Sequence, residues 1–316
     1  MDDHSNEKDI NTKNFYIAKQ ISRIISTNYS KFSMDIGENL LNSLIKLKKI
    51  LLLCPLSLYP VFSNNLIETN LNELSVKVFQ RYLIPGEKTV VFMEIFKCNL
   101  SLIFDCSRWS ETFCRYMLSN QEFEESLVKV ILNAPYNDYT KFIIQNCVSV
   151  VNNIIRRESM RDKFKLVPVS KLLEIYHSDI TTKEFKIISC SVVFYIVPDK
   201  EIEQYYPLAH ELKSDIIAIL YEASNSGTFQ AKGFSINELL EVLKIFSKDY
   251  SMKDFVGLNR DLFSILILAL GKNYLINNLV KFARYIYCEE KFEDFRTSFV
   301  KQYGRSNVRI MELLET

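Results

Sequence analysis

The chain has 316 residues, of which 48% are hydrophobic and 24% charged, and this balance is typical of a folded protein. Its formal net charge of +1 gives no electrostatic reason to expect nucleic acid or an anionic membrane surface as a partner. With only 7 Gly and 7 Pro, the chain has too few turn formers for a β-sandwich or barrel. The composition therefore favours helices joined by short polar loops.

The N-terminal residues are polar and lack the apolar core of a signal peptide, so we expect residues 1–13 to form a disordered tail. No later apolar run reaches the ~20 residues that a membrane span requires. Apolar side chains then recur at helical spacing. The first predicted helices cover residues 15–25, 35–54 and 66–83.

From residue 88 onwards, a short, a medium and a long apolar segment recur in the same order. The long segments lie around Cys98, Cys147 and Cys190, at spacings of about 49 and 43 residues. A period of 40–50 residues is typical of stacked helical repeats, in which each unit packs only on its neighbours. The sequence therefore predicts an α-solenoid.

The repeat pattern continues to residue 303, with one interruption. Segment 224–235 contains three Ser and two Gly, and we expect it to form a joint or an embellished repeat. We therefore predict one solenoid over residues 14–303, followed by a C-terminal end at 304–316. The remaining predicted helices cover residues 109–118, 122–133, 161–166, 168–177, 208–223, 235–246, 261–271, 277–288 and 292–303.

Residues 167–197 resemble an armadillo repeat. Such a repeat has a second helix that opens with a proline and carries a Leu-Leu pair, followed by a long third helix of small and branched apolar residues. Here these features are Pro168, the pair Leu172 and Leu173, and the run 187–197. The resemblance extends over residues 88–200 and more loosely over 235–290, and HEAT-type solenoids are related. It implies an all-α fold, a right-handed α-solenoid of armadillo-like helical repeats.

Armadillo proteins of the nuclear-import type bind extended peptides with a ladder of Trp and Asn side chains on their third helices. Asn153 matches the ladder Asn, but Ser149 stands where the Trp would be. On the neighbouring long segment, Ile196 stands at the position of the Asn. We therefore do not expect this chain to bind basic nuclear-localisation peptides through that ladder.

No enzymatic motif stands out. The three histidines have no His or Cys companion at metal-ligand spacing, and none is recognisably paired with a nucleophile. Glu122, Glu124 and Glu125 lie at a predicted helix start, where negative charge favours the helix dipole. We therefore expect no catalysis, no cofactor and no metal.

The seven cysteines are odd in number, form no Cys-x-x-Cys pair and lie mostly inside apolar runs. This usage indicates free, buried thiols in a reducing compartment. We expect a cytoplasmic protein, with the nucleus as the alternative.

The working hypothesis is a non-catalytic scaffold or adaptor that binds a protein or peptide along the concave face made by the long helices. The candidate contact residues are Asn99, Asn153, Arg156 and Arg157. The alternative is a regulatory module of a larger enzyme system, such as the armadillo segment that restrains a TIR-type NAD hydrolase and senses a nucleotide. The sequence names neither the partner nor the oligomeric state.

Overall fold

The computed structural model describes residues 3–272, 276–304 and 308–315, and over these ranges the fold is all-α with a single two-stranded hairpin. The chain divides into two compact units, Met1–Lys171 and Leu172–Thr316. The predicted fold class is therefore confirmed at the level of an all-helical fold. Within the described ranges, no helix is both long and apolar enough to cross a lipid bilayer.

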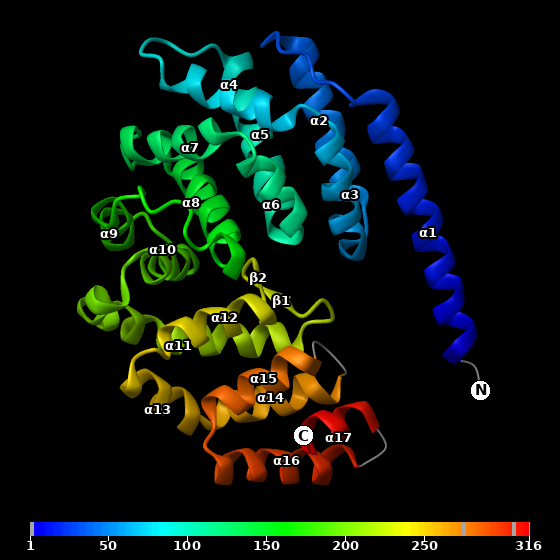
Figure 1. Cartoon of the computed structure of the whole chain (residues 1–316), viewed down its shortest axis with the longest axis vertical. Helices are drawn as coiled ribbons and strands as arrows, with labels where there is room; N and C mark the ends of the chain where they lie inside the picture. The colour runs from blue at the N-terminus through cyan, green and yellow to red at the C-terminus, as the bar shows by residue number, and fades with distance from the viewer. Residues whose placement is uncertain (1–2, 273–275, 305–307, 316) are drawn as a thin grey trace. The chain divides into compact units, whose positions relative to one another are not determined.

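The first unit contains helices in the predicted short, medium and long order. They are α1 (Asp3–Asn28), α2 (Glu38–Leu53), η1 (Leu56–Leu58), α3 (Tyr59–Asn65), η2 (Leu66–Glu68), α4 (Leu71–Leu83), α5 (Val90–Trp109), α6 (Glu111–Leu118), α7 (Gln121–Asn133), α8 (Lys141–Ile155) and η3 (Glu158–Met160). Corresponding helices pack on one another: α3 on α6, α4 on α7, and α2 and α8 on α5 (Figure 1). This is the packing expected of stacked repeats.

Side-chain caps define where these helices begin. Thr89, Ser110 and Asn120 accept hydrogen bonds from backbone N–H groups in the first turns of α5, α6 and α7. Each cap satisfies a donor that has no partner inside the helix. Ser110 also ends α5, so a single residue separates the long helix of one repeat from the short helix of the next.

Hydrogen bonds between successive repeats reproduce the predicted period. Four of the bonded pairs lie 42 to 46 positions apart in sequence, and Arg156 and Arg157 bond to residues 48 and 50 positions earlier. The four pairs are Ser22 with Asn65, Asn72 with Tyr116, Gln80 with Glu122, and Ser107 with Asn153. A helical repeat of about this length is therefore consistent with both the pattern and the contacts.

The second unit follows the same principle. Its elements are α9 (Val169–His177, which begins in the first unit), α10 (Lys183–Ile196), η4 (Asp199–Tyr205), α11 (Tyr206–Asn225), β1 (Gln230–Ala231), β2 (Phe234–Ser235), α12 (Ile236–Phe246), α13 (Tyr250–Leu258), α14 (Arg260–Gly271), α15 (Ile276–Ile286), α16 (Glu289–Tyr303) and α17 (Val308–Glu315). α14 packs on α11, and α15 packs on α12. In Figure 1 these four helices form the centre of this unit.

Phenylalanines fill much of the core in both units. In the first unit, the ring of Phe79 lies 5.7 Å from that of Phe96 and 5.9 Å from that of Phe123. In the second, Phe194 and Phe246 lie 4.8 Å apart. Because such rings bury a large apolar area and also interact with one another, they join adjacent helices into one core.

Segment 224–235, the predicted joint, lies within the second unit. Instead of a loose linker, it forms the hairpin of β1 and β2, and β1 packs on α11. Lys232 and Gly233 occupy the turn with φ of 49° and 82°. Positive φ at both central residues is the signature of the two-residue type I′ turn. The two compact units divide after Lys171, and the role of segment 224–235 as a joint stays a prediction.

α1 begins at Asp3, and the disordered tail expected over residues 1–13 stays a prediction. One further segment differs from the predicted helices. The short helix predicted over 161–166 is a run of turns, in which Phe164 has a φ of 60° and its N–H donates to Glu124 Oε1. A positive φ at Phe164 is incompatible with a right-handed helix.

Candidate functional site

Two of the residues predicted to bind a partner lie in the core of the first unit. Asn99 is 0% exposed, and its Oδ1 accepts a hydrogen bond from Ser75 Oγ at 3.2 Å. Asn153 is 4% exposed and donates to Ser107 Oγ at 3.2 Å. Asn153 therefore bonds to the preceding repeat, and both side chains are buried, with their polar atoms turned to other residues of the chain.

The other two predicted residues hold the end of α5. Arg156 Nη2 donates to the Arg108 carbonyl at 2.9 Å, and Arg157 Nη2 donates to the Ser107 carbonyl at 2.6 Å. These carbonyls lie in the last turn of α5, where no intrahelical donor remains for them and the helix dipole favours positive charge. The two arginines thus tie α8 to α5, and their role as partner contacts stays a prediction.

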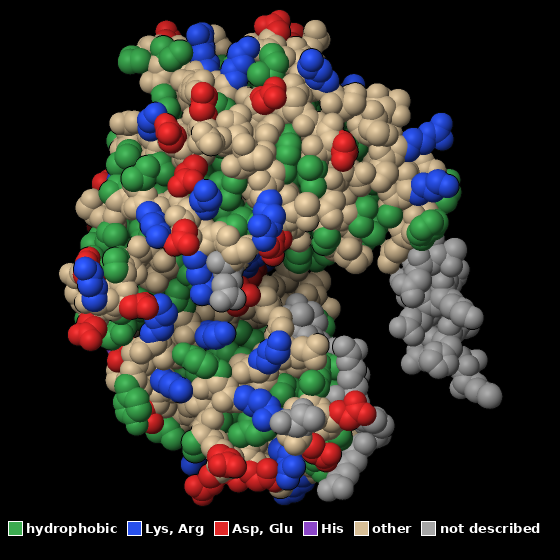
Figure 2. Space-filling view, viewed as in Figure 1, with side chains coloured by type: hydrophobic (Ala, Val, Ile, Leu, Met, Phe, Trp, Pro, Cys, Tyr) green, Lys and Arg blue, Asp and Glu red, His purple; other side chains and the backbone are tan. Residues whose placement is uncertain are grey.

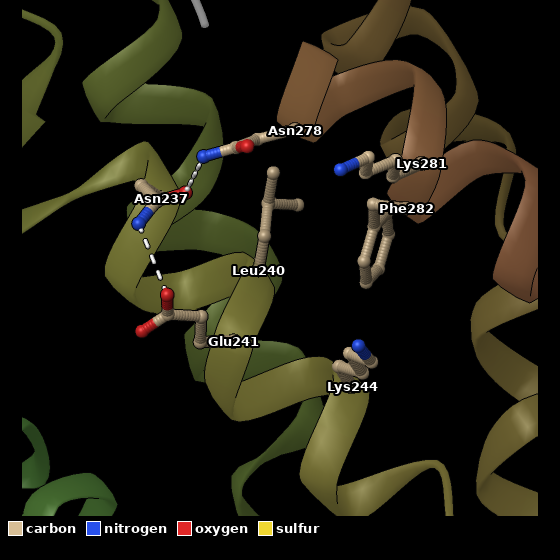
Figure 3. Close-up of a pocket in the computed structure, with 7 residues that line it drawn as sticks. All are labelled: Asn237, Leu240, Glu241, Lys244, Asn278, Lys281 and Phe282. Atoms are coloured by element: carbon tan, nitrogen blue, oxygen red, sulfur yellow. Dashed lines mark hydrogen bonds between the residues drawn. The ribbon is translucent and has the colours of Figure 1, made fainter. Parts of the chain in front are cut away.

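A pocket on the surface of the second unit is a better candidate site. It lies between α12 and α15, has a volume of about 180 Å³, and we call it the α12–α15 pocket. Its lining residues are Asn237, Leu240, Glu241 and Lys244 from α12, and Asn278, Lys281 and Phe282 from α15. Leu240 and Phe282 face each other across it, and the two asparagines stand at one end (Figure 3).

The two asparagines and a carboxylate form a short hydrogen-bonded chain. Asn278 Nδ2 donates to Asn237 Oδ1 at 2.7 Å, and Asn237 Nδ2 donates to Glu241 Oε1 at 3.2 Å. This chain fixes the amide of Asn237 between its neighbours. Asn278 keeps its own carbonyl oxygen and a second N–H available, because an amide has two donors and an acceptor oxygen.

The start of α12 positions this site. Ser235 Oγ accepts from the Glu238 N–H, and Glu238 Oε2 accepts from the Ser235 N–H, which together form a capping box. The reciprocal bonds fix the first turn of α12. Asn237 lies within that turn and is thereby held at the mouth of the pocket.

Two lysines give the pocket a positive edge. Lys281 and Lys244 stand on either side of the Phe282 ring (Figure 3). Lys244 Nζ also lies 5.6 Å from the centroid of the Tyr285 ring, within the range of a cation–π contact. Neither lysine forms a salt bridge with any carboxylate in the described part of the chain. Their positive charge is therefore available to a ligand.

A second pocket lies further along α15, against α13, and we call it the α13–α15 pocket. It has a volume of about 290 Å³. Its lining residues are Tyr250, Lys253, Asp254, Gly257, Leu258, Ile286, Tyr287, Cys288 and Lys291. Lys253 Nζ lies 5.0 Å from the centroid of the Tyr285 ring, the same ring that Lys244 approaches. Tyr285 therefore stands between lysines of the two pockets.

A serine, a histidine and an aspartate meet at the start of α13, but their geometry is not that of a catalytic triad. Asp249 Oδ2 and Ser251 Oγ both lie against the same ring nitrogen of His210, at 2.9 Å and 3.0 Å. A triad needs the carboxylate and the nucleophile on opposite nitrogens. Burial raises the pKa of Asp249, but hydrogen bonds from Ser251, His210 and the backbone outweigh it, so the pKa is lowered overall. The cluster is a helix cap.

The acidic residues at 122–125 also have internal partners. Glu122 accepts from Gln80, Glu124 accepts from the Phe164 N–H, and Glu125 pairs with Lys129. Across the described ranges, no group of three or more His, Cys, Asp or Glu side chains could hold a metal ion. The seven cysteines, all in described ranges, form no disulfide. Burial raises the pKa of the Cys106, Cys147 and Cys190 thiols, which keeps them protonated.

Comparisons with known proteins leave the family open. No family model matches the chain, and no curated protein matches it. One solved structure, that of an engineered protein, aligns with a TM-score of 0.39 and 11% identity, covering 88% of this chain and 97% of its own.

Sequence patterns alone did not reveal the two pockets, although one signal was present. The sequences of α12, INELLEVLKIF, and α15, INNLVKFARYI, align without gaps at an offset of 40 residues, with Ile, Asn and Leu at matching places. In this alignment Asn237 matches Asn277. In the structure, however, Asn237 forms its hydrogen bond with Asn278. The repeat could have indicated the two helices, but not which of the adjacent asparagines lines the pocket.

Proposed function

We propose that this protein is a non-catalytic scaffold that binds an extended segment of a partner protein in the α12–α15 pocket. The observation that supports it is the pair Asn237 and Asn278, contributed by two adjacent helices beside the apolar floor of Leu240 and Phe282. Asn278 offers an acceptor and a donor side by side, which matches the N–H and C=O groups of a peptide backbone. The apolar floor would receive one side chain of the bound segment.

The size of the pocket favours a peptide side chain over a small molecule. At about 180 Å³, it falls below the range of roughly 300–1,000 Å³ of sites that enclose drug-sized ligands. An extended peptide would need only this much room for one anchoring side chain, while its backbone crosses the surface. For this reason we prefer a peptide-binding role over a nucleotide-sensing one.

We further propose that the repeats are of the armadillo type and wind as a right-handed α-solenoid. The recurring short, medium and long helices support this assignment, as do Pro168 and the Leu172–Leu173 pair. An experimental structure would test it, because a left-handed winding or two-helix repeats throughout would contradict it. If the repeats are of this type, α12 and α15 are corresponding helices of successive repeats.

The test is peptide binding by matched variants. A displayed library of short random peptides is selected on the purified protein, and the affinities of the selected peptides are measured for wild type, Asn278→Ala and Asn277→Ala. Asn277 is the neighbouring exposed residue on the same helix, but it does not line the pocket. We expect Asn278→Ala to weaken binding roughly 5-fold or more, because it removes one hydrogen bond of about 1 kcal/mol or more.

Asn277→Ala should leave the affinity unchanged, and circular dichroism should show equal helicity for all three proteins. Equal affinities for wild type and Asn278→Ala would refute the proposed site. NAD⁺ and ATP are titrated in parallel. A nucleotide that raises the melting temperature of wild type, but not of the Asn278→Ala variant, would favour the nucleotide-sensing alternative instead.

A further inference from the structure

We propose that one continuous acidic segment of the partner occupies both the α12–α15 pocket and the α13–α15 pocket, passing over Tyr285. The inference rests on the proposed function and adds the chemistry and the length of the bound segment. It starts from the shared helix, because α15 and the residues directly after it line both pockets.

Tyr285 marks the passage between the two pockets. Lys244 of the first pocket and Lys253 of the second both lie over its ring, at 5.6 Å and 5.0 Å from the centroid. Tyr285 is partly exposed, and its hydroxyl donates to the Ser247 carbonyl at 3.5 Å. The ring is thus held in place, and a chain that crosses it meets lysines on both sides.

The charge of the two pockets favours an acidic ligand. Together they are lined by four lysines and two carboxylates. None of the four lysines forms a salt bridge within the described ranges, and one of the carboxylates, Glu241, accepts a hydrogen bond from Asn237. In Figure 2, Lys and Arg side chains are spread over α11 to α15, whereas Asp and Glu gather over α16. Complementary charge would therefore select Asp and Glu in the partner.

The spacing of the pockets sets the length of the segment. From Phe282 to Ile286, the apolar residues with which α15 lines the two pockets, the helix rises by about 6 Å at roughly 1.5 Å per residue. An extended chain covers that distance in about two residues at roughly 3.3 Å each. Residues two apart on an extended chain point to the same side. One apolar side chain would thus reach Leu240 and Phe282, and a second, two positions away, would reach Leu258 and Ile286.

The test uses synthetic peptides of defined pattern. The acidic probes carry two apolar residues two positions apart, with Glu at the other positions. The matched neutral probes carry Gln instead of Glu, and the truncated probes keep only one apolar residue with its flanking Glu. Affinities are measured by fluorescence anisotropy for wild type, Lys281→Gln, Lys291→Gln and the control Lys301→Gln. Lys301 is an exposed lysine of α16 that lines neither pocket.

We expect the acidic two-anchor probes to bind more tightly than the neutral and the truncated ones. Lys281→Gln and Lys291→Gln should each weaken their binding roughly 2- to 5-fold, as for exposed charge pairs, and the control should not. Each truncated probe should respond to only one of the two pocket substitutions. The difference between acidic and neutral probes should shrink as salt is raised.

Equal binding of acidic and neutral probes would overturn the inference. The inference would also be overturned if the affinity of the two-anchor probes fell with Lys281→Gln but not with Lys291→Gln. In either case, the proposed function would stand if Asn278→Ala still weakened binding of the neutral probes. If no probe bound and no library peptide was selected, both proposals would fail.

Discussion

Asp105 shows how one residue makes stability depend on pH. Its carboxyl is largely buried on α5, and burial raises its pKa to about 6, although Lys48 and Arg108 nearby act in the opposite direction. In an unfolded chain an aspartate titrates near 3.9. The folded state therefore holds the proton to higher pH than the unfolded state, so this group favours folding below about pH 4 and loses that contribution as pH rises to about 6.

We predict that Asp105→Asn stabilises the protein at pH 7.5 and has little effect at pH 4. The amide resembles the protonated carboxyl and carries no charge to desolvate. A shift of about two pKa units sets an upper limit of about 3 kcal/mol on the gain. Urea unfolding at the two pH values measures it, and a gain of the same size at both would contradict the assignment.

Gly271 marks a close approach between two helices. A Cβ placed there would lie 2.1 Å from Cζ of Tyr303, so either the Tyr303 ring or the two helices would have to shift. We predict that Gly271→Ala lowers the free energy of unfolding by about 1–3 kcal/mol, the usual cost of overpacking. This loss would occur although Ala is the better helix former.

The double variant Gly271→Ala with Tyr303→Leu isolates that contact. If the clash is the cause, the alanine should cost less when Tyr303→Leu is already present, and the double-mutant cycle should show a coupling of at least about 0.5 kcal/mol. If Gly271→Ala lowers the free energy of unfolding equally with Tyr and with Leu at position 303, the contact with Tyr303 is not the cause of the loss.

Among the elements, the junction of α5 and α8 depends on a pair of arginines that donate to backbone carbonyls. We predict that Arg157→Ala lowers the free energy of unfolding by about 1–3 kcal/mol, because it leaves part-buried carbonyls of Ser107 and Arg108 without this donor. Arg115→Ala is the control, since it removes an exposed ion pair with Glu111, worth at most about 1 kcal/mol. Chemical denaturation compares the two, and equal losses would contradict the prediction.

Most helices could be predicted from the sequence because apolar spacing and caps are local signals. The hairpin at β1 and β2 was missed, since its Lys232–Gly233 turn lies in a segment whose composition indicates only a loop. The turns at 161–166 were missed because the positive φ of Phe164 is imposed by contacts with α7. Local propensity does not include such tertiary contacts.

The site was harder to predict than the fold. Periodicity indicated that Asn153 lies on a long helix, but not that its amide would bond to Ser107 of the preceding repeat. The direction of a polar side chain depends on the register between neighbouring repeats, and a single sequence does not define that register. The pocket residues Asn237 and Asn278 become adjacent only through it.

For the molecule as a whole, repeat architecture limits how far a local change spreads. Since each repeat contacts mainly its neighbours, stability is close to a sum of local terms. We predict that Gly271→Ala increases hydrogen exchange of backbone amides in α14 to α16, while amides of α4, α5, α7 and α8 keep their protection. Mass spectrometry of exchanged peptides measures this. Faster exchange in all of these helices would mean that the chain unfolds as one cooperative body.

The hydrogen bonds that join residues 42 to 46 positions apart also have a mechanical consequence. When the two ends are pulled apart, each detached repeat frees about 45 residues, or roughly 150 Å of extended chain at about 3.3 Å per residue. An optical-tweezers trace should therefore lengthen in steps of nearly equal size, with the force falling after each. The extension gained in each step would then measure the repeat period of the sequence.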